Sequence, residues 1–314
     1  MAHRKLIKMK SSICSDITLN NAAEMYLDRC RAENLSEASI TTYRRKWKRF
    51  LAAFGIEPVS YITKDRFEGW KSTIVADDSI KDHTKASIIR HARTLMYYCM
   101  DEGYIDAYHI RQIKVEEMQK PVFSDDELSD LLQMPRTKSF PLFRTWAIVC
   151  FLAGTGCRIS SAQEVRVSDV DTDIGYVYFR KNKNRKAYKI KIDAPMIGAI
   201  QCYLQVRGGS DDDYFFCTEA GERLSINYMQ RKVREYNAAH GIIAIDACHQ
   251  YRRTYATYLA RKGINAYQLK ERLGQSSITI SQKYVNLAEQ EQTMVDSPLQ
   301  LMKQQMPRKR IRMK

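Results

Sequence analysis

The stretch LFRTWAIVCFLAGTG, residues 142–156, constrains the fold more than any other part of the sequence. Its residues are apolar on nearly every side of a helix, and a helix of that kind must be buried all round. We therefore expect it to be the central element of a domain. Gly154 and Gly156 end the helix, and Arg158 follows directly. This arginine is either held rigidly for a function or is an ordinary helix-start residue in a salt bridge.

Length and charge narrow the class of protein. A chain of 314 residues, 44% of them hydrophobic, is long enough for two domains with sizeable cores. The formal net charge of +15 indicates a polyanionic partner, and nucleic acid fits better than a membrane surface because neither a long apolar run nor a signal peptide is present. The eight cysteines form no CxxC or Cys/His cluster, which predicts buried, reduced thiols and no zinc site.

Residues 18–103 show the periodicity of a compact all-helical unit. Its second predicted helix begins after Ser36 and ends at Gly55, with an apolar stripe on one face. The other face carries a run of cations that would suit DNA phosphates, namely Arg44, Arg45, Lys46, Lys48 and Arg49. A later helix, from near Lys81 to Glu102, has a second basic side with Lys81, Lys85, Arg90 and Arg93. Either face could instead be merely solvated.

The domain boundary is expected near residues 115–122, in a connector with weak periodicity that ends at Pro121. Ser124 and Glu127 then form a capping box for a helix through Leu132. The expected organisation is a basic N-terminal arm, a helical domain, a linker, a larger second domain and a tail, at residues 1–17, 18–115, 116–122, 123–290 and 291–314.

A strongly basic β-hairpin is predicted in the second domain. Apolar residues alternate around Tyr176–Tyr178 and again around Tyr188–Ile192, and Lys181, Lys183 and Arg185 lie between them. Such a hairpin would suit insertion along a DNA groove, although lysines also protect a solvated edge from aggregation. The pattern then predicts a helix from Pro195 to about Arg207, a short strand at Tyr214–Cys217 and a helix from Ser225 to His240.

The sequence HQYR places His249 and Arg252 three residues apart, so both side chains point from one face of a helix. Arginine offers a planar fork of donors to phosphate oxygens, and histidine can carry a proton near neutral pH. An isolated HxxR is more often a surface helix turn. Arg253 follows directly and is a further candidate for DNA binding, and Tyr284 comes after the turn Gly274-Gln275-Ser276-Ser277.

Three motifs together resemble the tyrosine recombinases, the group of phage integrases and chromosome resolvases. They are GTGCRIS around Arg158, HQYR, and LGQSSITISQKY ending in Tyr284. The resemblance covers nearly the whole chain and implies a mainly α fold with a small β-sheet (α+β). Residues 18–115 correspond to a helical core-binding domain on DNA, and residues 123–290 to a catalytic domain.

The resemblance also implies a role for each site residue. Arg158 and Arg252 would clamp the non-bridging oxygens of a DNA phosphate, and Tyr284 would attack it to form a 3′-phosphotyrosine. His249 would be the base or positioning group, and the hairpin lysine, Lys181 or next Lys183, the general acid. No metal, ATP or other cofactor is expected. Partners would be duplex recombination sites and further copies of the chain, in a tetramer on two sites, in prokaryotic cytoplasm or nucleoid.

Several positions depart from the family pattern. Ser161 stands where many relatives carry Glu, Tyr251 replaces Leu, and Arg253 replaces a second His. Gln275 occupies the usual His or Trp position; it can donate a hydrogen bond but cannot shuttle a proton. Two other functions therefore stay open, a type IB topoisomerase-like enzyme and a DNA-binding regulator without catalysis. The resemblance implies that a mobile element or resolution system uses the protein, with its tail docked on a neighbouring protomer.

Overall fold

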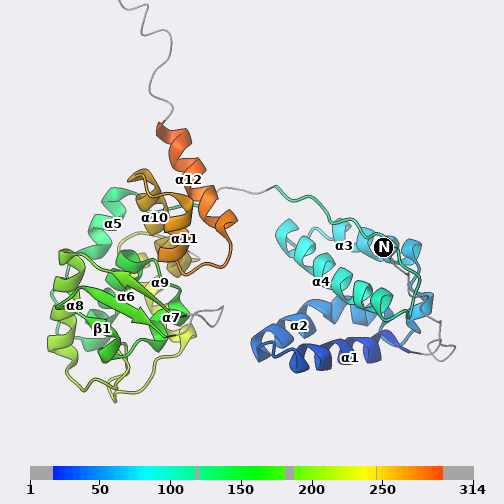
Figure 1. Ribbon diagram of the computed structural model, residues 1–314, viewed down its shortest axis with the longest axis horizontal. Coiled ribbons are helices and arrows are strands. Elements are labelled where there is room, and N and C mark those ends of the chain that lie inside the picture. The colour runs from blue at the N-terminus through cyan, green and yellow to red at the C-terminus, as the bar shows by residue number, and fades with distance from the viewer. Residues whose placement is uncertain (1–16, 117–119, 181–186, 245, 293–314) are drawn as a thin grey trace, which may run out of the picture. The chain divides into compact units, whose positions relative to one another are not determined.

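The structure is a computed structural model that describes residues 17–116, 120–180, 187–244 and 246–292. The chain divides into two compact units, residues 1–119 and 120–314, and each is described by itself. Most of the described chain is helical, and its one named sheet has three antiparallel strands (Figure 1). The predicted fold class, mainly α with a small β-sheet, is confirmed.

The first unit contains the four helices that its apolar periodicity predicts. Thr18, Ser36 and Thr63 each cap a helix by accepting a hydrogen bond from a backbone N–H of the first turn. The elements are α1 (Leu19–Ala32), α2 (Glu37–Phe54), the 3-10 turn Val59–Tyr61, α3 (Lys64–Ala76) and α4 (Asp82–Asp101).

Aromatic side chains fill the core of this unit. Trp47 and Phe50 on α2 are fully buried, and Trp47 donates its indole N–H to the His91 carbonyl oxygen of α4 at 2.7 Å. The segment after α4 packs on the same core: Ile110 is fully buried, and the Tyr108 hydroxyl donates to the Ile62 carbonyl oxygen at 3.2 Å. This segment therefore belongs to the first unit.

The central helix of the second unit is α6 (Phe140–Thr155), and every residue from 144 to 152 is buried. Helices from several parts of the chain surround it, which confirms the central position expected from its all-round apolar surface. The other helical elements are α5 (Asp125–Leu132), α7 (Ile159–Glu164), the 3-10 turn Val167–Asp169, α8 (Ala194–Arg207), α9 (Ile226–Ala239), α10 (Ala247–Arg261), α11 (Ala266–Arg272) and α12 (Ile278–Gln292).

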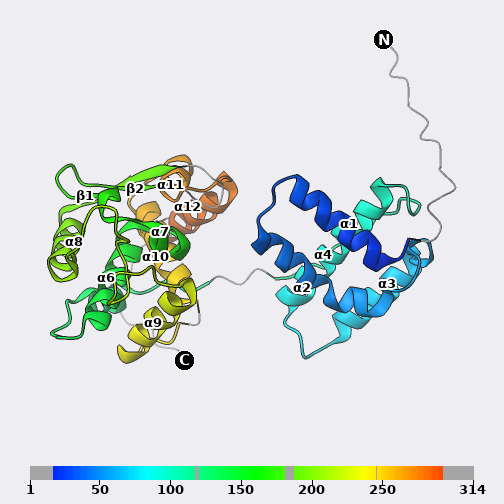
Figure 2. The ribbon, with the colours of Figure 1, turned by 90° about the horizontal axis from the view of Figure 1, so that it is seen from below.

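Two strands of the sheet form the base of the predicted hairpin. Strands β2 (Tyr176–Phe179) and β3 (Tyr188–Lys191) pair antiparallel, with Phe179 opposite Tyr188. A two-residue strand, β1 (Val170–Asp171), pairs with the outer side of β2 and was not predicted. The hairpin tip, residues 181–186, lies outside the described residues. The strand β3 contacts α11, and Figure 2 shows α11 and α12 close together next to the sheet.

The prediction of a strand at Tyr214–Cys217 is wrong. Only isolated bridges occur there, Tyr214 with Arg166 and Cys217 with Arg223. Phe215 and Phe216 are adjacent and both buried, which the two-residue alternation of a regular strand at a sheet surface does not allow. The chain bends at Phe215 and Phe216 because both rings point into the core.

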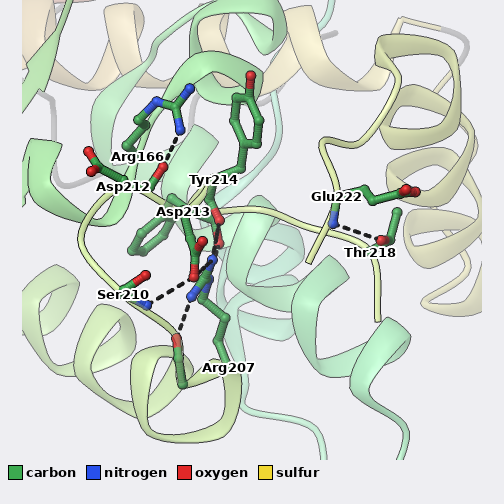
Figure 3. Close-up of polar contacts among 10 residues, drawn as sticks. Arg166, Arg207, Ser210, Asp212, Asp213, Tyr214, Thr218 and Glu222 are labelled. Carbon is green, nitrogen blue, oxygen red and sulfur yellow. Dashed lines mark hydrogen bonds and ion pairs between the residues drawn. The ribbon is translucent and has the colours of Figure 1, made fainter. Parts of the chain in front are cut away.

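Polar contacts fix the loop that precedes this bend (Figure 3). Arg207 at the end of α8 donates from Nη2 to the Tyr214 carbonyl oxygen at 2.7 Å, and the Asp213 carboxylate accepts from the Ser210 backbone N–H at 2.9 Å. Arg166 donates to the Asp212 carbonyl oxygen. The hydrogen bond from Ser210 lowers the pKa of Asp213. The acidic loop 211–213 thus serves local structure.

The seven described cysteines are all free, and six of them are buried, as expected for structural thiols. Within the same described ranges, no helix has both the length and the apolar character needed to cross a bilayer.

Candidate active site

Arg252 is the centre of the candidate site. It lies on α10 with only 6% of its surface exposed. Its guanidinium donates to the Gly156 carbonyl oxygen at 2.8 Å and to the Leu273 carbonyl oxygen at 2.9 Å. It therefore joins the turn after α6 to the turn after α11.

Arg158 comes from the turn after α6. Gly156 has a left-handed backbone (φ 61°), and a Cβ there would lie 2.3 Å from Cδ1 of Tyr255, so only glycine fits. Two residues later Arg158 occupies the N-cap position of α7, and its guanidinium donates to the Gly274 carbonyl oxygen at 3.4 Å. Both arginines thus bind the backbone of the same turn, at residues 273 and 274.

Two positive charges meet here without a counter-ion. Burial, together with the smaller effect of the neighbouring charge of Arg158, lowers the pKa of Arg252 to about 10. Neither arginine forms an ion pair with a carboxylate in the part of the chain that the structure describes. A buried cation is costly unless an anion compensates it. The arrangement therefore suits an external anion such as a phosphate diester.

His249 lies one turn before Arg252 on α10, with an exposed side chain. The surrounding protein partly desolvates the ring, which lowers the pKa of His249 below its ordinary value. Asp246 opposes this shift, whereas the charges of Arg252 and Arg253 add to it. The imidazole is accordingly neutral at pH 7 and able to accept a proton.

Tyr284 lies half-buried on α12, against a small apolar core formed with Tyr255, Leu269 and Leu273. Burial raises the pKa of the Tyr284 phenol. The charges of Arg252 and Arg253 act in the opposite direction, so these arginines favour the phenolate. The structure thus brings together Arg158, Arg252, Tyr284 and His249, four of the residues that the sequence singles out.

Gln275 directly follows the turn that the two arginines bind. Its backbone N–H donates to the Lys270 carbonyl oxygen at 3.0 Å. Its side-chain Oε1 accepts a hydrogen bond from Ser281 of α12 at 2.9 Å. The backbone of Gln275 is therefore fixed directly after the turn that the arginines bind, and its carboxamide is held by α12.

Arg253 is tied to protein groups. It donates to the Asp246 carboxylate at 3.1 Å and to the Pro121 carbonyl oxygen at 3.2 Å. It thus fastens the start of the second unit to α10, a contact that the sequence did not predict.

Lys181, Lys183 and Arg185, the cationic hairpin residues, lie outside the described residues. The described base of the hairpin reaches the site through Tyr188, whose ring stacks on Phe179 with centroids 4.6 Å apart. A Cβ on Gly274 would lie 3.0 Å from Cζ of Tyr188, so this ring packs against the turn that the two arginines bind. The sequence predicts Tyr188 only as a residue of an alternating strand, and that alternation is its one signal of an inward position.

The basic face of α2 in the first unit is only partly free. Arg44 makes two hydrogen bonds with the Glu24 carboxylate, at 2.8 and 2.6 Å, and Arg49 pairs with Asp77 at 2.7 Å. Arg45 and Lys48 are exposed, as is Arg90 on α4, and Lys46 is partly exposed.

The expectation that Lys85 lies on an exposed basic side is wrong. The residue is 7% exposed, and its ammonium group donates to the Val75 carbonyl oxygen at 2.7 Å. Its aliphatic stem packs inward because its position on the helix surface falls between those of the buried residues Ile88 and Ile89, one turn later.

Comparison with known proteins decides the family. The model of the phage integrase family matches residues 121–291, which include every element of the candidate site.

The chain belongs to the phage integrase family. As a member, it is a site-specific recombinase enzyme, and the resemblance to tyrosine recombinases is confirmed.

Similar proteins extend the match beyond residues 121–291. The tyrosine recombinase XerA of Pyrococcus furiosus is 27% identical over 249 residues, covering 77% of this integrase family member and 82% of XerA. The Tn1549 transposon integrase in complex with a circular intermediate DNA has a similar fold, with a TM-score of 0.68 at 17% identity, over 87% of this chain and 99% of that one. A lambda integrase tetramer bound to a Holliday junction matches with a TM-score of 0.68 at 19% identity, over 87% of this chain and 79% of that one.

Proposed function

We propose that the protein cleaves and rejoins DNA strands through a covalent 3′-phosphotyrosine at Tyr284. The observation that carries this proposal is the uncompensated pair Arg158 and Arg252, held on the turn that leads into the helix of Tyr284. A phosphate diester gathers negative charge on its non-bridging oxygens as it is attacked. Two fixed guanidinium groups stabilise that charge and hold the phosphorus in line with the phenol.

The proton and bond changes balance within these residues. A bond forms between the Tyr284 oxygen and phosphorus while the bond from phosphorus to the 5′-oxygen breaks. The phenol proton passes to neutral His249, and the departing 5′-oxygen takes a proton from Lys181, or Lys183 in its place. Gln275 donates a hydrogen bond to a non-bridging oxygen. Rejoining reverses these steps with a new 5′-hydroxyl.

Neither metal nor ATP enters this scheme. The covalent link conserves one phosphodiester bond, so rejoining is close to isoenergetic. The arginines and the lysine supply positive charge that a divalent ion supplies in other enzymes. The residues of this chain therefore account for each proton and each charge of the reaction.

A suicide substrate tests the proposal. A duplex site nicked next to the cleavage position loses a short 5′-hydroxyl fragment and traps the covalent protein–DNA complex. We expect the complex with wild-type protein and none with Tyr284→Phe, while both proteins bind the site equally. A covalent complex that persists in Tyr284→Phe would contradict the assignment. Exchange of strands between two sites separates recombination from simple relaxation of supercoils.

We further propose that residues 18–115 hold the core of the DNA site, through exposed cations on α2 and α4, and that residues 123–290 form the catalytic domain. The lambda integrase neighbour is a tetramer on a Holliday junction, and we propose the same assembly here on two duplex sites. We also propose that it acts in the cytoplasm or nucleoid of a prokaryotic cell.

The tail is proposed to hold this assembly together. An apolar groove of about 760 Å³ lies between α5, α6, α8 and α10, lined by residues such as Leu128, Trp146, Met196 and Leu259. The sequence after α12 offers apolar side chains for it, at Met294, Val295, Leu299, Leu301 and Met302. We propose that the tail of one protomer occupies the groove of the next. Truncation after residue 292 should abolish assembly of two sites and preserve binding of one.

A further inference from the structure

The backbone of Gln275 is fixed by the end of α11. Gly274 has a left-handed backbone (φ 57°), its N–H donates to the Glu271 carbonyl oxygen at 3.0 Å, and the Gln275 N–H donates to the Lys270 carbonyl oxygen at 3.0 Å. These two bonds form a Schellman motif, in which the glycine reverses the chain and the next residue closes the helix end. The Cα of Gln275 consequently has a defined place beside the arginine pair.

The side chain of Gln275 is fixed by a different helix. The Ser281 hydroxyl donates to Gln275 Oε1 at 2.9 Å, and Ser281 has no exposed surface. A serine inside a helix more often bonds to the backbone carbonyl four residues earlier. Here the hydroxyl is used on a side chain across the turn, so one end of the carboxamide is specified.

A carboxamide has an acceptor end and a donor end. Because Oε1 accepts from Ser281, the two N–H donors of Nε2 stay available. Gln275 immediately follows Leu273 and Gly274, the residues whose carbonyl oxygens the arginines bind. An anion held by Arg158 and Arg252 offers only acceptor oxygens, so it attracts the NH₂ end and repels the carbonyl end.

We propose that Ser281 is a positioning residue that turns the NH₂ group of Gln275 toward the scissile phosphate. This inference rests on the proposed function and deepens it. Ser281 lies three residues before Tyr284 on α12, close to the same helix face. The same bond therefore fixes Gln275 relative to the helix that carries the nucleophile.

A double-mutant cycle with a suicide duplex tests this. Single-turnover rates of covalent-complex formation are compared for wild type, Ser281→Ala, Gln275→Ala and the double variant, all with saturating protein. We expect Ser281→Ala to slow cleavage about tenfold, because a donor that is free to rotate loses most of its effect on the transition state. The double variant should be no slower than Gln275→Ala, since Ser281 acts through Gln275. Ser281→Thr, which keeps the hydroxyl, should restore the wild-type rate within about twofold.

A matched control separates positioning from folding. Thr145 on α6 is also buried, and its hydroxyl donates to the Pro141 carbonyl oxygen at 2.8 Å, away from the site. Thr145→Val should lower the thermal midpoint about as much as Ser281→Ala and leave cleavage unchanged. If instead the Ser281→Ala and Gln275→Ala effects multiply in the double variant, Ser281 does not act through Gln275 and the inference is overturned.

A second readout needs no cleavage. The side-chain NH₂ signals of Gln275 in the NMR spectrum of the free protein, assigned by their loss in Gln275→Ala, should shift in Ser281→Ala and stay in place in Ser281→Thr. Unchanged signals in Ser281→Ala would overturn the positioning role. If the wild-type protein forms no covalent complex, the proposed function fails, while these signals still decide the role of Ser281.

Discussion

The guanidinium of Arg252 donates to the carbonyl oxygen of Gly156 at 2.8 Å and so holds α10 to the turn that ends the central helix. Its second hydrogen bond, to Leu273, holds the turn that leads to α12. One side chain therefore both carries charge for an anion and joins the pieces that present Arg158 and Tyr284. A lysine at position 252 would keep the positive charge but lose the pair of hydrogen bonds to the two turns, so this substitution separates the two roles.

Arg252→Lys is expected to slow covalent-complex formation by about 10²-fold or more, because a single ammonium cannot replace a fixed fork of donors. It should also lower the free energy of unfolding by about 1–3 kcal/mol, since buried carbonyl oxygens lose their donors. Single-turnover cleavage and urea titration measure the two effects. Arg207→Lys is the control: this arginine also binds backbone carbonyls, away from the site, and its replacement should affect stability alone. Near-normal cleavage by Arg252→Lys would contradict the clamp.

The pH dependence of cleavage should report His249. The pKa of His249 lies below its ordinary value, so the neutral ring that accepts a proton predominates at pH 7. The rate should stay level as pH falls through neutrality and drop only at a pH below the ordinary pKa of histidine, when the ring becomes protonated. Single-turnover rates at constant ionic strength measure this profile.

Asp246→Asn provides the matched test of that assignment. The Asp246 carboxylate is the group that raises the His249 pKa, and it also neutralises Arg253. Its removal should move the acid limb to still lower pH. His249→Gln should remove the limb together with most of the activity. A limb that stays unchanged in both variants would assign the titration to another group.

The sequence predicts the helices of this protein better than its irregular segments. Ser36, Thr63 and the Ser124–Glu127 capping box mark helix starts by local hydrogen bonds, which short stretches of sequence contain in full. The short run at Tyr214–Cys217 resembles a strand in composition. The segment bends because Phe215 and Phe216 are both buried, and their burial depends on residues far away in the sequence.

In the candidate site, too, contacts between segments far apart in the sequence could not be predicted. Arg158, Arg252 and Tyr284 were identified from motifs, but the hydrogen bonds of the two arginines to turns remote in sequence could not be predicted. The support from Tyr188 under Gly274 and the bond from Ser281 to Gln275 depend on tertiary packing. Lys85 was misplaced because lysine is ordinarily exposed, although its helical position lies on the face of the buried residues Ile88 and Ile89. Its hydrogen bond to the Val75 carbonyl oxygen depends on tertiary packing.

The correction at Lys85 gives a prediction for DNA binding by the first unit. Arg45→Ala and Lys48→Ala should each weaken binding and reduce the slope of log affinity against log salt by about 0.9, the effect of one lost phosphate contact. Lys85→Met should leave that slope unchanged and lower the free energy of unfolding by about 1–3 kcal/mol, because the Val75 carbonyl oxygen loses its donor. Anisotropy titrations over a range of salt concentrations distinguish the two classes. A reduced slope in Lys85→Met would restore Lys85 to the DNA-facing side.

The two turn glycines should tolerate alanine unequally. Replacing a glycine of positive φ by alanine should lower the free energy of unfolding by about 1 kcal/mol through backbone strain alone. Gly103→Ala measures that strain by itself, because no atom lies within 4 Å of its new Cβ. Gly156→Ala should cost about 1–3 kcal/mol more because its Cβ overlaps the Tyr255 ring at 2.3 Å. Gly274→Ala, at 3.0 Å from Tyr188, should lie between them and slow cleavage more than its stability loss explains. Thermal unfolding and single-turnover cleavage of the three variants provide the ranking, and equal losses would contradict the packing argument.

A substrate with a changed leaving group can show whether Lys181 or Lys183 is the general acid. A general acid is needed because a 5′-alkoxide leaves poorly, whereas a 5′-thiolate is stable without a proton near neutral pH. Replacing the bridging 5′-oxygen by sulfur should therefore rescue cleavage by the variant that lacks the acid. We expect Lys181→Ala to be slow on the oxygen substrate and close to wild type on the sulfur substrate, with Lys183→Ala slowed equally on both through weaker DNA binding. The reverse pattern would assign the acid to Lys183. Arg158→Ala is the control that sulfur should not rescue, since its charge acts on the non-bridging oxygens and the leaving atom is not its target.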